Sequence, residues 1–143
     1  QEALRLYQGE FQPSEFLKTP YVIAGINVIV ADTDEEAVRL STSFIELLSG
    51  MSMGVMQTVK PPGEMTSELV QVLRQPQISQ MFKYLFVGSK KTVRAKVESF
   101  ARAANIDEII AVSTMYALED RIRSAQLFAE VMEEINVNMG VGI

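Results

Sequence analysis

The chain has 143 residues, of which 48% are hydrophobic and 22% are charged, and its net charge is −5 at pH 7. This length predicts a single domain over residues 1–143 with a hydrophobic core, and the composition gives no sign of wholesale disorder. No basic cluster indicates a nucleic-acid partner, and no apolar run approaches the roughly 20 residues that span a membrane.

Two absences limit the chemistry of the chain. It has no Cys, which excludes a disulfide, a thiolate nucleophile and a Cys-ligated metal. It has no His, which excludes a Ser-His-Asp mechanism and His-bound zinc within this chain. Catalysis by this chain would need carboxylates, Lys, Tyr or a cofactor. The sequence does not indicate which residue would be catalytic, and no metal site is predicted. The lack of Cys is consistent with a reducing cytoplasm, where we expect the protein to reside.

The N-terminal segment is predicted to be helical over residues 1–10, without a start signal. Its charged residues interrupt the apolar core that a signal peptide needs. The chain lacks an initiator Met, which is consistent with processing or truncation. Pro13 stops this helix, and a short helical turn is expected over residues 14–17.

The clearest signal in the chain is a strand followed at once by a helix. Residues 22–31 are apolar on both faces, as in a central parallel strand covered on both sides. Thr33 fits a helix N-cap, with Glu36 three residues later to complete a capping box. An apolar stripe predicts a helix to about Leu48, with Gly50 as its end.

The middle of the chain is less regular. Residues 51–63 have no periodic pattern and end in Pro-Pro-Gly. A short helix is expected over residues 66–74, and Pro76 follows it. Residues 78–83 favour another helix, and residues 84–87 an extended run.

A second strand-and-helix region closes the chain. Ser89 is expected to cap a helix that ends at Asn105, a residue suited to the left-handed conformation. Residues 108–114 are predicted to form a second apolar strand and residues 118–134 the last helix. Residues 136–143 carry no predicted element.

This order predicts an α/β fold with two strong parallel strands and flanking helices. A parallel sheet needs cover on both faces and more than two strands to be stable by itself. We therefore expect the chain to be part of a larger enzyme.

Several stretches resemble the bacterial luciferase-like monooxygenases, which are flavin-dependent enzymes on a TIM-type (β/α)₈ barrel. Together they extend from Tyr7 to about Met132. Phe86–Val93 is similar to the family's Val-Gly-Ser-Pro-Glu-Thr-Val stretch, with Lys90 and Lys91 in place of the Pro and Glu. The other matching stretches are Phe11–Ser14, Pro20–Ala37, Asp107–Tyr116 and Arg121–Ser124.

The resemblance implies that the chain is the C-terminal part of such a barrel. Residues 22–31 would be strand seven and residues 108–114 strand eight, with strands one to six upstream. It also implies FMN as the cofactor, and O₂ and a small organic molecule as substrates. In the family, many groups that hold FMN belong to the upstream part, so this chain alone is expected to lack a complete active site.

Four residues are candidates for contact with the cofactor. Asn27 is the polar residue in a predicted buried strand, and the alternative is a core amide satisfied by its neighbours. Ser113, Thr114 and Tyr116 follow the last strand, and (β/α)₈ enzymes place their active sites at that end. Asp32 occupies the same level on the earlier strand, where helix capping is the favoured explanation.

Two further features have alternative explanations. The sequence Gly88-Ser89-Lys90-Lys91 could hold a phosphate at a helix N-terminus, although a capped surface helix explains it more simply. The methionines of the insert could form an adaptable lid over a long-chain substrate, a packing surface or a partner surface. These four residues are Met51, Met53, Met56 and Met65.

Two functions from different classes are compatible with these observations. The first is the C-terminal part of an FMN-dependent monooxygenase that uses reduced flavin and O₂ to oxidise an organic substrate. The second is a non-catalytic shortened relative or fragment that folds as a homo-oligomer, most simply a homodimer, because exposed sheet edges and apolar faces drive association.

Overall fold

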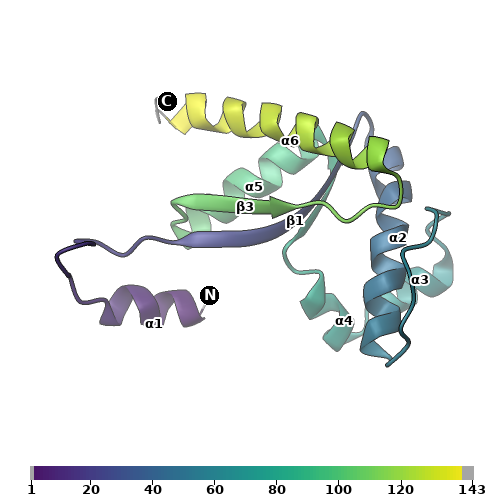
Figure 1. Cartoon of the computed structure of the whole chain (residues 1–143), viewed down its shortest axis with the longest axis horizontal. Helices are drawn as coiled ribbons and strands as arrows, with labels where there is room; N and C mark the ends of the chain where they lie inside the picture. Colours follow the sequence, from purple (N-terminus) through teal and green to yellow (C-terminus); the bar gives the residue numbers. More distant parts are fainter. Residues whose placement is uncertain (1, 140–143) are drawn as a thin grey trace.

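The computed structural model describes residues 2–139, where three parallel strands form one sheet flanked by six helices (Figure 1). The strands are β1 (Ile23–Ala31), β2 (Leu85–Ser89) and β3 (Glu108–Val112). The helices are α1 (Glu2–Glu10), α2 (Asp34–Ser52), α3 (Ser67–Leu73), α4 (Pro76–Met81), α5 (Lys90–Ala104) and α6 (Leu118–Met139). The predicted α/β class and the parallel placement of the two strong strands are confirmed.

β1 is the central strand, but its two neighbours pair with different halves of it. The sheet order is β2-β1-β3. β3 pairs with the amino-terminal half of β1, from Ile23 to Asn27. β2 pairs with the carboxyl-terminal half, from Asn27 to Ala31. Asn27 is therefore the residue at which the two pairings overlap.

One face of β1 packs against α5 and α6 and forms the main core. Ile26, Val28 and Val30 are each at most 2% exposed and point to this side. They contact Val93 and Val97 of α5 in one continuous apolar cluster. α6 adds a second set of side chains, namely Leu127, Phe128, Val131 and Ile135. Burial of these apolar side chains is the main source of stability for this layer.

The opposite face of β1 is covered only along its carboxyl-terminal half. There Ile29 and Ala31 pack against Ala37, Leu40 and Phe44 of α2. Phe82, which follows α4, closes this cluster with an edge-to-face contact to Phe44 at 6.0 Å between ring centroids. The prediction that residues 22–31 are covered on both faces holds for this half.

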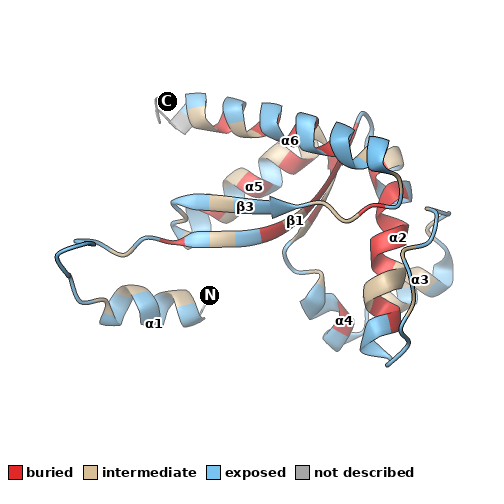
Figure 2. Ribbon diagram, viewed as in Figure 1, coloured by how far each residue is buried: buried red, intermediate tan, exposed pale blue. Residues whose placement is uncertain are grey.

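The amino-terminal half of the same face is open. Ile23 of β1 and Ile110 and Val112 of β3 are 52%, 54% and 53% exposed, although their side chains are apolar. Figure 2 shows β3 almost entirely exposed, whereas the carboxyl-terminal half of β1 is buried. The apolar sequence of β3 is typical of a strand that is buried on both faces. Its side chains are nevertheless exposed, because no described segment packs against the open side of the sheet.

Some element boundaries differ from the sequence expectations. The extended run over residues 84–87 is a third sheet strand, and the predicted strand over residues 108–114 ends at Val112. Residues 14–17 form no helix. Instead, the Ser14 hydroxyl accepts hydrogen bonds from the backbone N–H groups of Phe16 and Leu17.

Two helices run past their predicted ends. α2 continues through Gly50 to Ser52, and Gln57 lies so close to Gly50 that an added Cβ there would clash with the side-chain amide nitrogen of Gln57. α6 continues to Met139, because Ile135 is buried in the main core. The expectation that residues 136–143 carry no element is therefore wrong up to residue 139, and the remainder lies outside the described residues.

Candidate functional site

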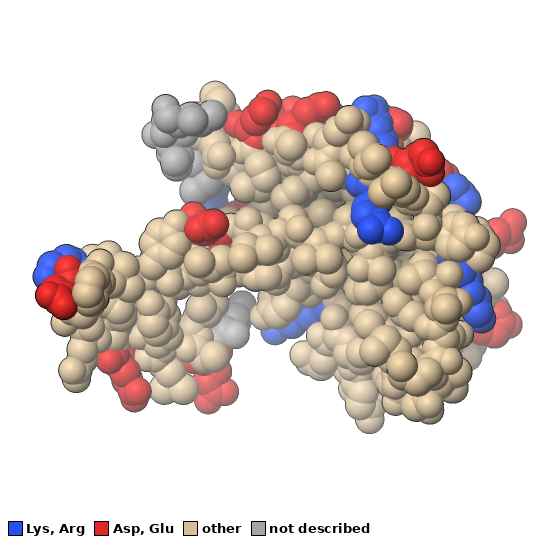
Figure 3. All heavy atoms as spheres, in the orientation of Figure 1, with Lys and Arg blue, Asp and Glu red and all other residues tan. Residues whose placement is uncertain are grey.

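The sheet has one surface that residues 2–139 leave uncovered, which we call the open face. It consists of Ile23, Gly25 and Asn27 of β1 with Ile110 and Val112 of β3. These side chains share one side because Cβ atoms alternate along a strand and the register aligns β1 with β3. By the same register Glu108, at the start of β3, lies on this side opposite Ile23, so the open face is apolar apart from the Glu108 carboxylate and the Asn27 amide. Figure 3 shows few charged side chains over the strands, while acidic side chains gather along α6.

Asn27 lies on the open face and is partly buried. Its backbone N–H donates to the carbonyl of Tyr84 at 2.9 Å, which fixes the start of the β1–β2 pairing. Within the described residues, no hydrogen bond to its side-chain amide is found. The core-amide alternative requires such a bond, so the geometry leaves this amide available to a ligand.

Ser113 has a structural role in the fold. Its hydroxyl donates to the carbonyl of Val28 at 2.6 Å and lies 3.1 Å from the hydroxyl of Ser124. Ser124 in turn accepts from the backbone N–H of Val30 at 2.9 Å. β3 has already ended at this level, so the two hydroxyls replace the backbone partners that a longer β3 would supply to β1.

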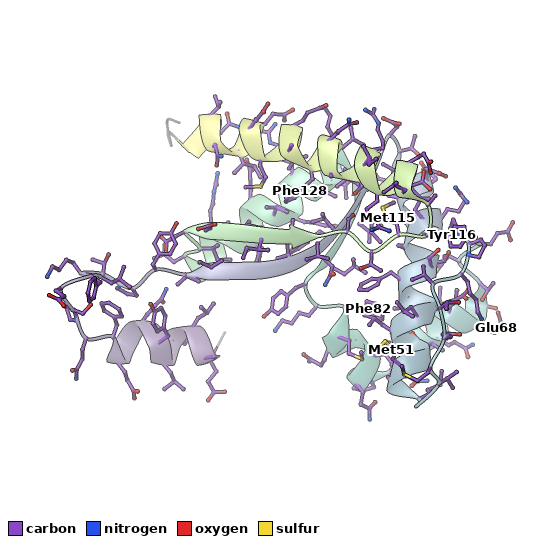
Figure 4. The ribbon with its side chains drawn as sticks, viewed as in Figure 1. Met51, Glu68, Phe82, Met115, Tyr116 and Phe128 are labelled. Carbon is purple, nitrogen blue, oxygen red and sulfur yellow. The ribbon has the colours of Figure 1, made fainter. Side chains whose placement is uncertain are left out.

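Thr114 and Tyr116 follow β3 and differ in exposure. Thr114 is half-buried, and Tyr116 is 52% exposed. Met115 between them is buried against Ile29 and Phe44. Figure 4 shows Met115 and Phe82 beside α2. The structure thus places Asn27 at the middle of β1 and Ser113, Thr114 and Tyr116 just after the end of β3, and whether they contact a cofactor stays a prediction.

The amino terminus of α5 is already occupied by a carboxylate. Asp34 accepts from the backbone N–H of Ser89 at 2.6 Å and from the hydroxyl of Thr92 at 3.0 Å. These hydrogen bonds, the backbone one first, lower the pKa of Asp34. Gly88 has φ +150°, and a Cβ there would lie 2.8 Å from the Asp34 carboxylate.

This arrangement contradicts a phosphate site at Gly88-Ser89-Lys90-Lys91. A phosphate would meet the Asp34 carboxylate where the helix N–H groups should bind it. Ser89 precedes the helix as predicted, but its hydroxyl makes no capping bond, and Asp34 supplies the cap instead. Thr33 does cap α2 by accepting from the backbone N–H of Glu36. The Glu36 carboxylate binds Arg39 at 2.7 Å, so only half of the predicted capping box forms.

Charged residues near the carboxyl end of the sheet are paired with each other. Asp32 binds Arg123 at 2.6 Å, which raises the pKa of Arg123. Lys90 binds Glu130 at 2.5 Å across α5 and α6, and this contact raises the pKa of Lys90 and lowers that of Glu130. These pairs join neighbouring secondary-structure elements at the surface and lie outside the open face.

The methionines of the insert lie away from the candidate residues. Met53 and Met56 are 67% and 89% exposed. Met51 lies in the last turn of α2, whereas Met115 contacts the first turns of that helix (Figure 4). A lid over a substrate therefore stays a prediction, with no described contact between these methionines and the open face.

The residues present fit one part of FMN and not another. The open face is mostly apolar and carries the Asn27 amide, and nothing lies within 4 Å of a Cβ placed on Gly25, so an aromatic ring has room beside it. The helix terminus that could take the phosphate holds Asp34 instead. Within residues 2–139, no cluster of acidic residues is arranged to bind a metal ion, and no helix has the length and apolarity to cross a membrane.

Sequence reasoning missed the residues that organise this end of the sheet. Ser124 is fully buried, and Asp34 reaches across from α2 to α5. The sequence could have indicated the role of Ser124, because this serine lies on the same helical stripe as the buried apolar residues of α6. No sequence signal links Asp34 to Ser89, because 55 residues separate them.

Comparison with known proteins adds independent information. No family model matches the chain. It is 30% identical to a luciferase-like monooxygenase of Escherichia coli (strain K12) over 134 residues, which are 94% of this chain and 40% of that protein. It is 33% identical to the uncharacterized protein YvbT of Bacillus subtilis (strain 168), over 90% of this chain and 38% of that protein.

A solved structure shows the same relation. The crystal structure of apo-MsnO8 aligns with a TM-score of 0.76 and 28% identity over 92% of this chain and 40% of that one. The chain therefore spans about 40% of the length of the curated relatives it matches. Most of this chain is homologous to luciferase-like monooxygenases, and its three-stranded parallel sheet with six described helices has the fold of the corresponding part of apo-MsnO8.

Proposed function

We propose that this chain is the C-terminal part of a luciferase-like (β/α)₈ monooxygenase that binds FMN and oxidises a small organic substrate with O₂. The homology to the Escherichia coli monooxygenase, over 94% of the chain, is the observation that carries the proposal. The uncovered apolar face and the parallel strand order are consistent with a segment of a closed barrel.

In this proposal the open face contributes to the wall of the active site. Reduced FMN supplies the reaction with O₂. Ile110 and Val112 exclude water from one side of the flavin ring, and the free Asn27 amide hydrogen-bonds to its polar edge. Thr114 and Tyr116 lie at the end of β3, where barrel enzymes bind substrate. Ser113 acts indirectly by fixing the loop that carries them.

The test replaces the matched stretch of the Escherichia coli relative with residues 2–139 of this chain. The chimera should quench FMN fluorescence with micromolar affinity, because both parts of the flavin site are then present. Val112→Asp in the chimera should weaken FMN binding at least about tenfold by placing a charge against the ring.

The control is Glu133→Gln on the exposed side of α6, which should leave FMN affinity unchanged. A chimera that folds, as judged by a cooperative urea transition, but does not bind FMN would refute the proposal.

A second candidate is supported by the open face itself. Half-exposed Ile23, Ile110 and Val112 on one surface form an apolar patch of the kind that drives association. The alternative function is a homodimer of this chain without flavin activity. A discrete dimer in native mass spectrometry, combined with no FMN binding by the chimera, would favour it.

A further inference from the structure

The open face ends at Asn27, where the cover that α2 provides begins. The register places Leu85 of β2 and Val112 of β3 on either side of Asn27, with all three side chains on the same side of the sheet. Two residues farther along β1, Ile29 points to this side and is only 1% exposed beneath α2. The Asn27 amide therefore lies at the foot of a wall, and the uncovered floor of the open face extends from its other side.

Phe82 forms the part of this wall that α2 does not supply. Its carbonyl accepts from the backbone N–H of Leu85 at 3.0 Å, so the turn into β2 fixes its position. Its ring packs edge-to-face against Phe44 of α2, with 6.0 Å between the ring centroids. Phe44 is 7% exposed, whereas Phe82 is only partly buried. Leu48, one turn farther along α2, also packs against this cluster and continues the wall away from the sheet.

The floor and the wall meet in a surface that we call the apolar corner. It consists of Asn27, Val112, Leu85, Phe82 and Leu48, none of which is charged. The neighbouring Lys83 places its ammonium 5.6 Å from the centroid of the Tyr84 ring and lines a separate groove beside α1. Glu68 lies on the other side of α2 from Phe82 (Figure 4). The apolar corner is therefore suited to an uncharged ligand.

The shape of the apolar corner favours a flat ring over a flexible chain. Within residues 2–139, the floor and the wall contact a ligand from two directions only. A flexible chain held in this way loses conformational freedom without being enclosed, whereas a planar molecule has little freedom to lose. The edge-to-face pair of Phe44 and Phe82 can also take a third ring in the same kind of packing.

We propose that the apolar corner binds the organic substrate and that this substrate is an uncharged, flat aromatic molecule with a hydroxyl or carbonyl group. Phe82 is then a specificity-determining residue. The inference rests on the proposed function, in which the flavin ring lies against Ile110 and Val112. A substrate in the corner would lie next to the flavin, with Asn27 between them. The side-chain amide of Asn27 has both donors and an acceptor, so it can bind both molecules.

The first experiment adds 2-naphthol, a flat aromatic probe with one hydroxyl, to the full chain and records side-chain resonances by NMR. The ring current of the bound probe should shift the methyl resonances of Leu48 and Leu85, and a hydrogen bond should shift the side-chain amide resonances of Asn27. Leu4 and Ala103 line the groove beside α1 and serve as internal references. Heptan-1-ol, an aliphatic alcohol of comparable hydrophobicity, should bind at least about fivefold more weakly.

A pair of variants at Phe82 separates specificity from packing. Phe82→Leu keeps an apolar side chain but removes the ring, so it should weaken 2-naphthol binding at least about fivefold and change heptan-1-ol binding by less than about twofold. Phe82→Tyr keeps the ring and should retain 2-naphthol binding. Phe100→Leu makes the same change in the groove beside α1 and is the matched control.

Four results would overturn this inference. The first is a set of 2-naphthol shifts confined to Leu4 and Ala103, which would place the probe in the groove beside α1. The second is equal affinity of the wild type for the two probes. The third is equal weakening of both probes in Phe82→Leu, which would show a packing role only. The fourth is displacement of 2-naphthol by FMN from the chimera, which would assign the corner to the flavin ring.

The outcome for the apolar corner can be separated from the outcome for the proposed function. Binding of either probe to this chain requires no flavin, so it succeeds or fails independently of FMN binding by the chimera. A chimera that does not bind FMN would refute the proposed function while the selectivity of the corner for a flat ring is still measured.

Discussion

The two faces of the sheet have similar sequences and opposite environments. Ile26 and Val28 on the helix-covered face are each 2% exposed, whereas Ile110 and Val112 on the open face are more than half exposed. All four are aliphatic residues of parallel strands, so side-chain type does not explain the difference. Apolar character in a strand thus indicates that a side chain is suited to burial, while the partner that buries it has to come from elsewhere.

The largest expected difference in stability is between two variants that each truncate one isoleucine, one on the covered face and one on the open face. Ile26→Ala leaves a cavity in the main core and should lower the free energy of unfolding by about 2–4 kcal/mol. Ile110→Ala removes a side chain that is already 54% exposed and should cost less than about 1 kcal/mol. Urea denaturation of both variants measures this. Equal losses would show that the open face is covered in solution.

A smaller effect is expected at the serine pair that extends the β1 pairing. Ser124→Ala leaves the buried Val30 N–H without its acceptor and should cost about 1–3 kcal/mol. Ser43→Ala is the matched control, because that buried hydroxyl has no partner among the described residues, and its removal should be close to neutral. A costly Ser43 variant and a neutral Ser124 variant would contradict the hydrogen bonding described here.

Asp34 should make the α2–α5 junction sensitive to acid. Hydrogen bonds from Ser89 and Thr92 lower its pKa in the folded state, so its contribution to stability is present above the unfolded pKa of about 3.9 and is lost as pH falls through the folded value. Asp34→Asn should therefore be less stable than the wild type at pH 6, and the two should converge as pH falls below about 3. Urea midpoints across this range measure it. A stability difference between the two proteins that does not change with pH would show that ionisation of Asp34 does not contribute to stability.

The smallest effect should come from the ion pairs on the covered side. Lys90 and Glu130 join α5 to α6 at the surface, where salt screens charges. Glu130→Gln should reduce the salt dependence of the melting temperature and change the melting temperature itself little. Glu119→Gln, in an exposed position without a described ion pair, is the control. A large loss that persists in high salt would indicate a role in packing.

Local sequence signals were sufficient for much of the fold. The apolar run before Thr33 predicted β1, and the Asn105 position predicted the left-handed end of α5, where φ is 52°. The parallel arrangement followed from the strand-to-helix order. The sequence of β2 did not distinguish a helix from a strand because the segment is short. Its parallel pairing with five residues of β1 makes it a strand.

The sequence predicted where the candidate residues lie relative to the strands, and their contact with a cofactor stays a prediction. The ends of the strands identified Ser113, Thr114 and Tyr116, since parallel strands present their carboxyl ends together. Only tertiary contacts show that the Ser113 hydroxyl donates to the Val28 carbonyl and that the Asn27 side-chain amide has no hydrogen bond within residues 2–139.

The sequence by itself determined the elements, because capping residues and hydrophobic periodicity act within a few residues. Tertiary structure alone decided which apolar surfaces are covered, where β1 changes partners and which carboxylate occupies the amino terminus of α5. Those features depend on contacts between residues far apart in the chain, such as the 85 residues that separate Val28 from Ser113. No local pattern encodes a contact over that distance.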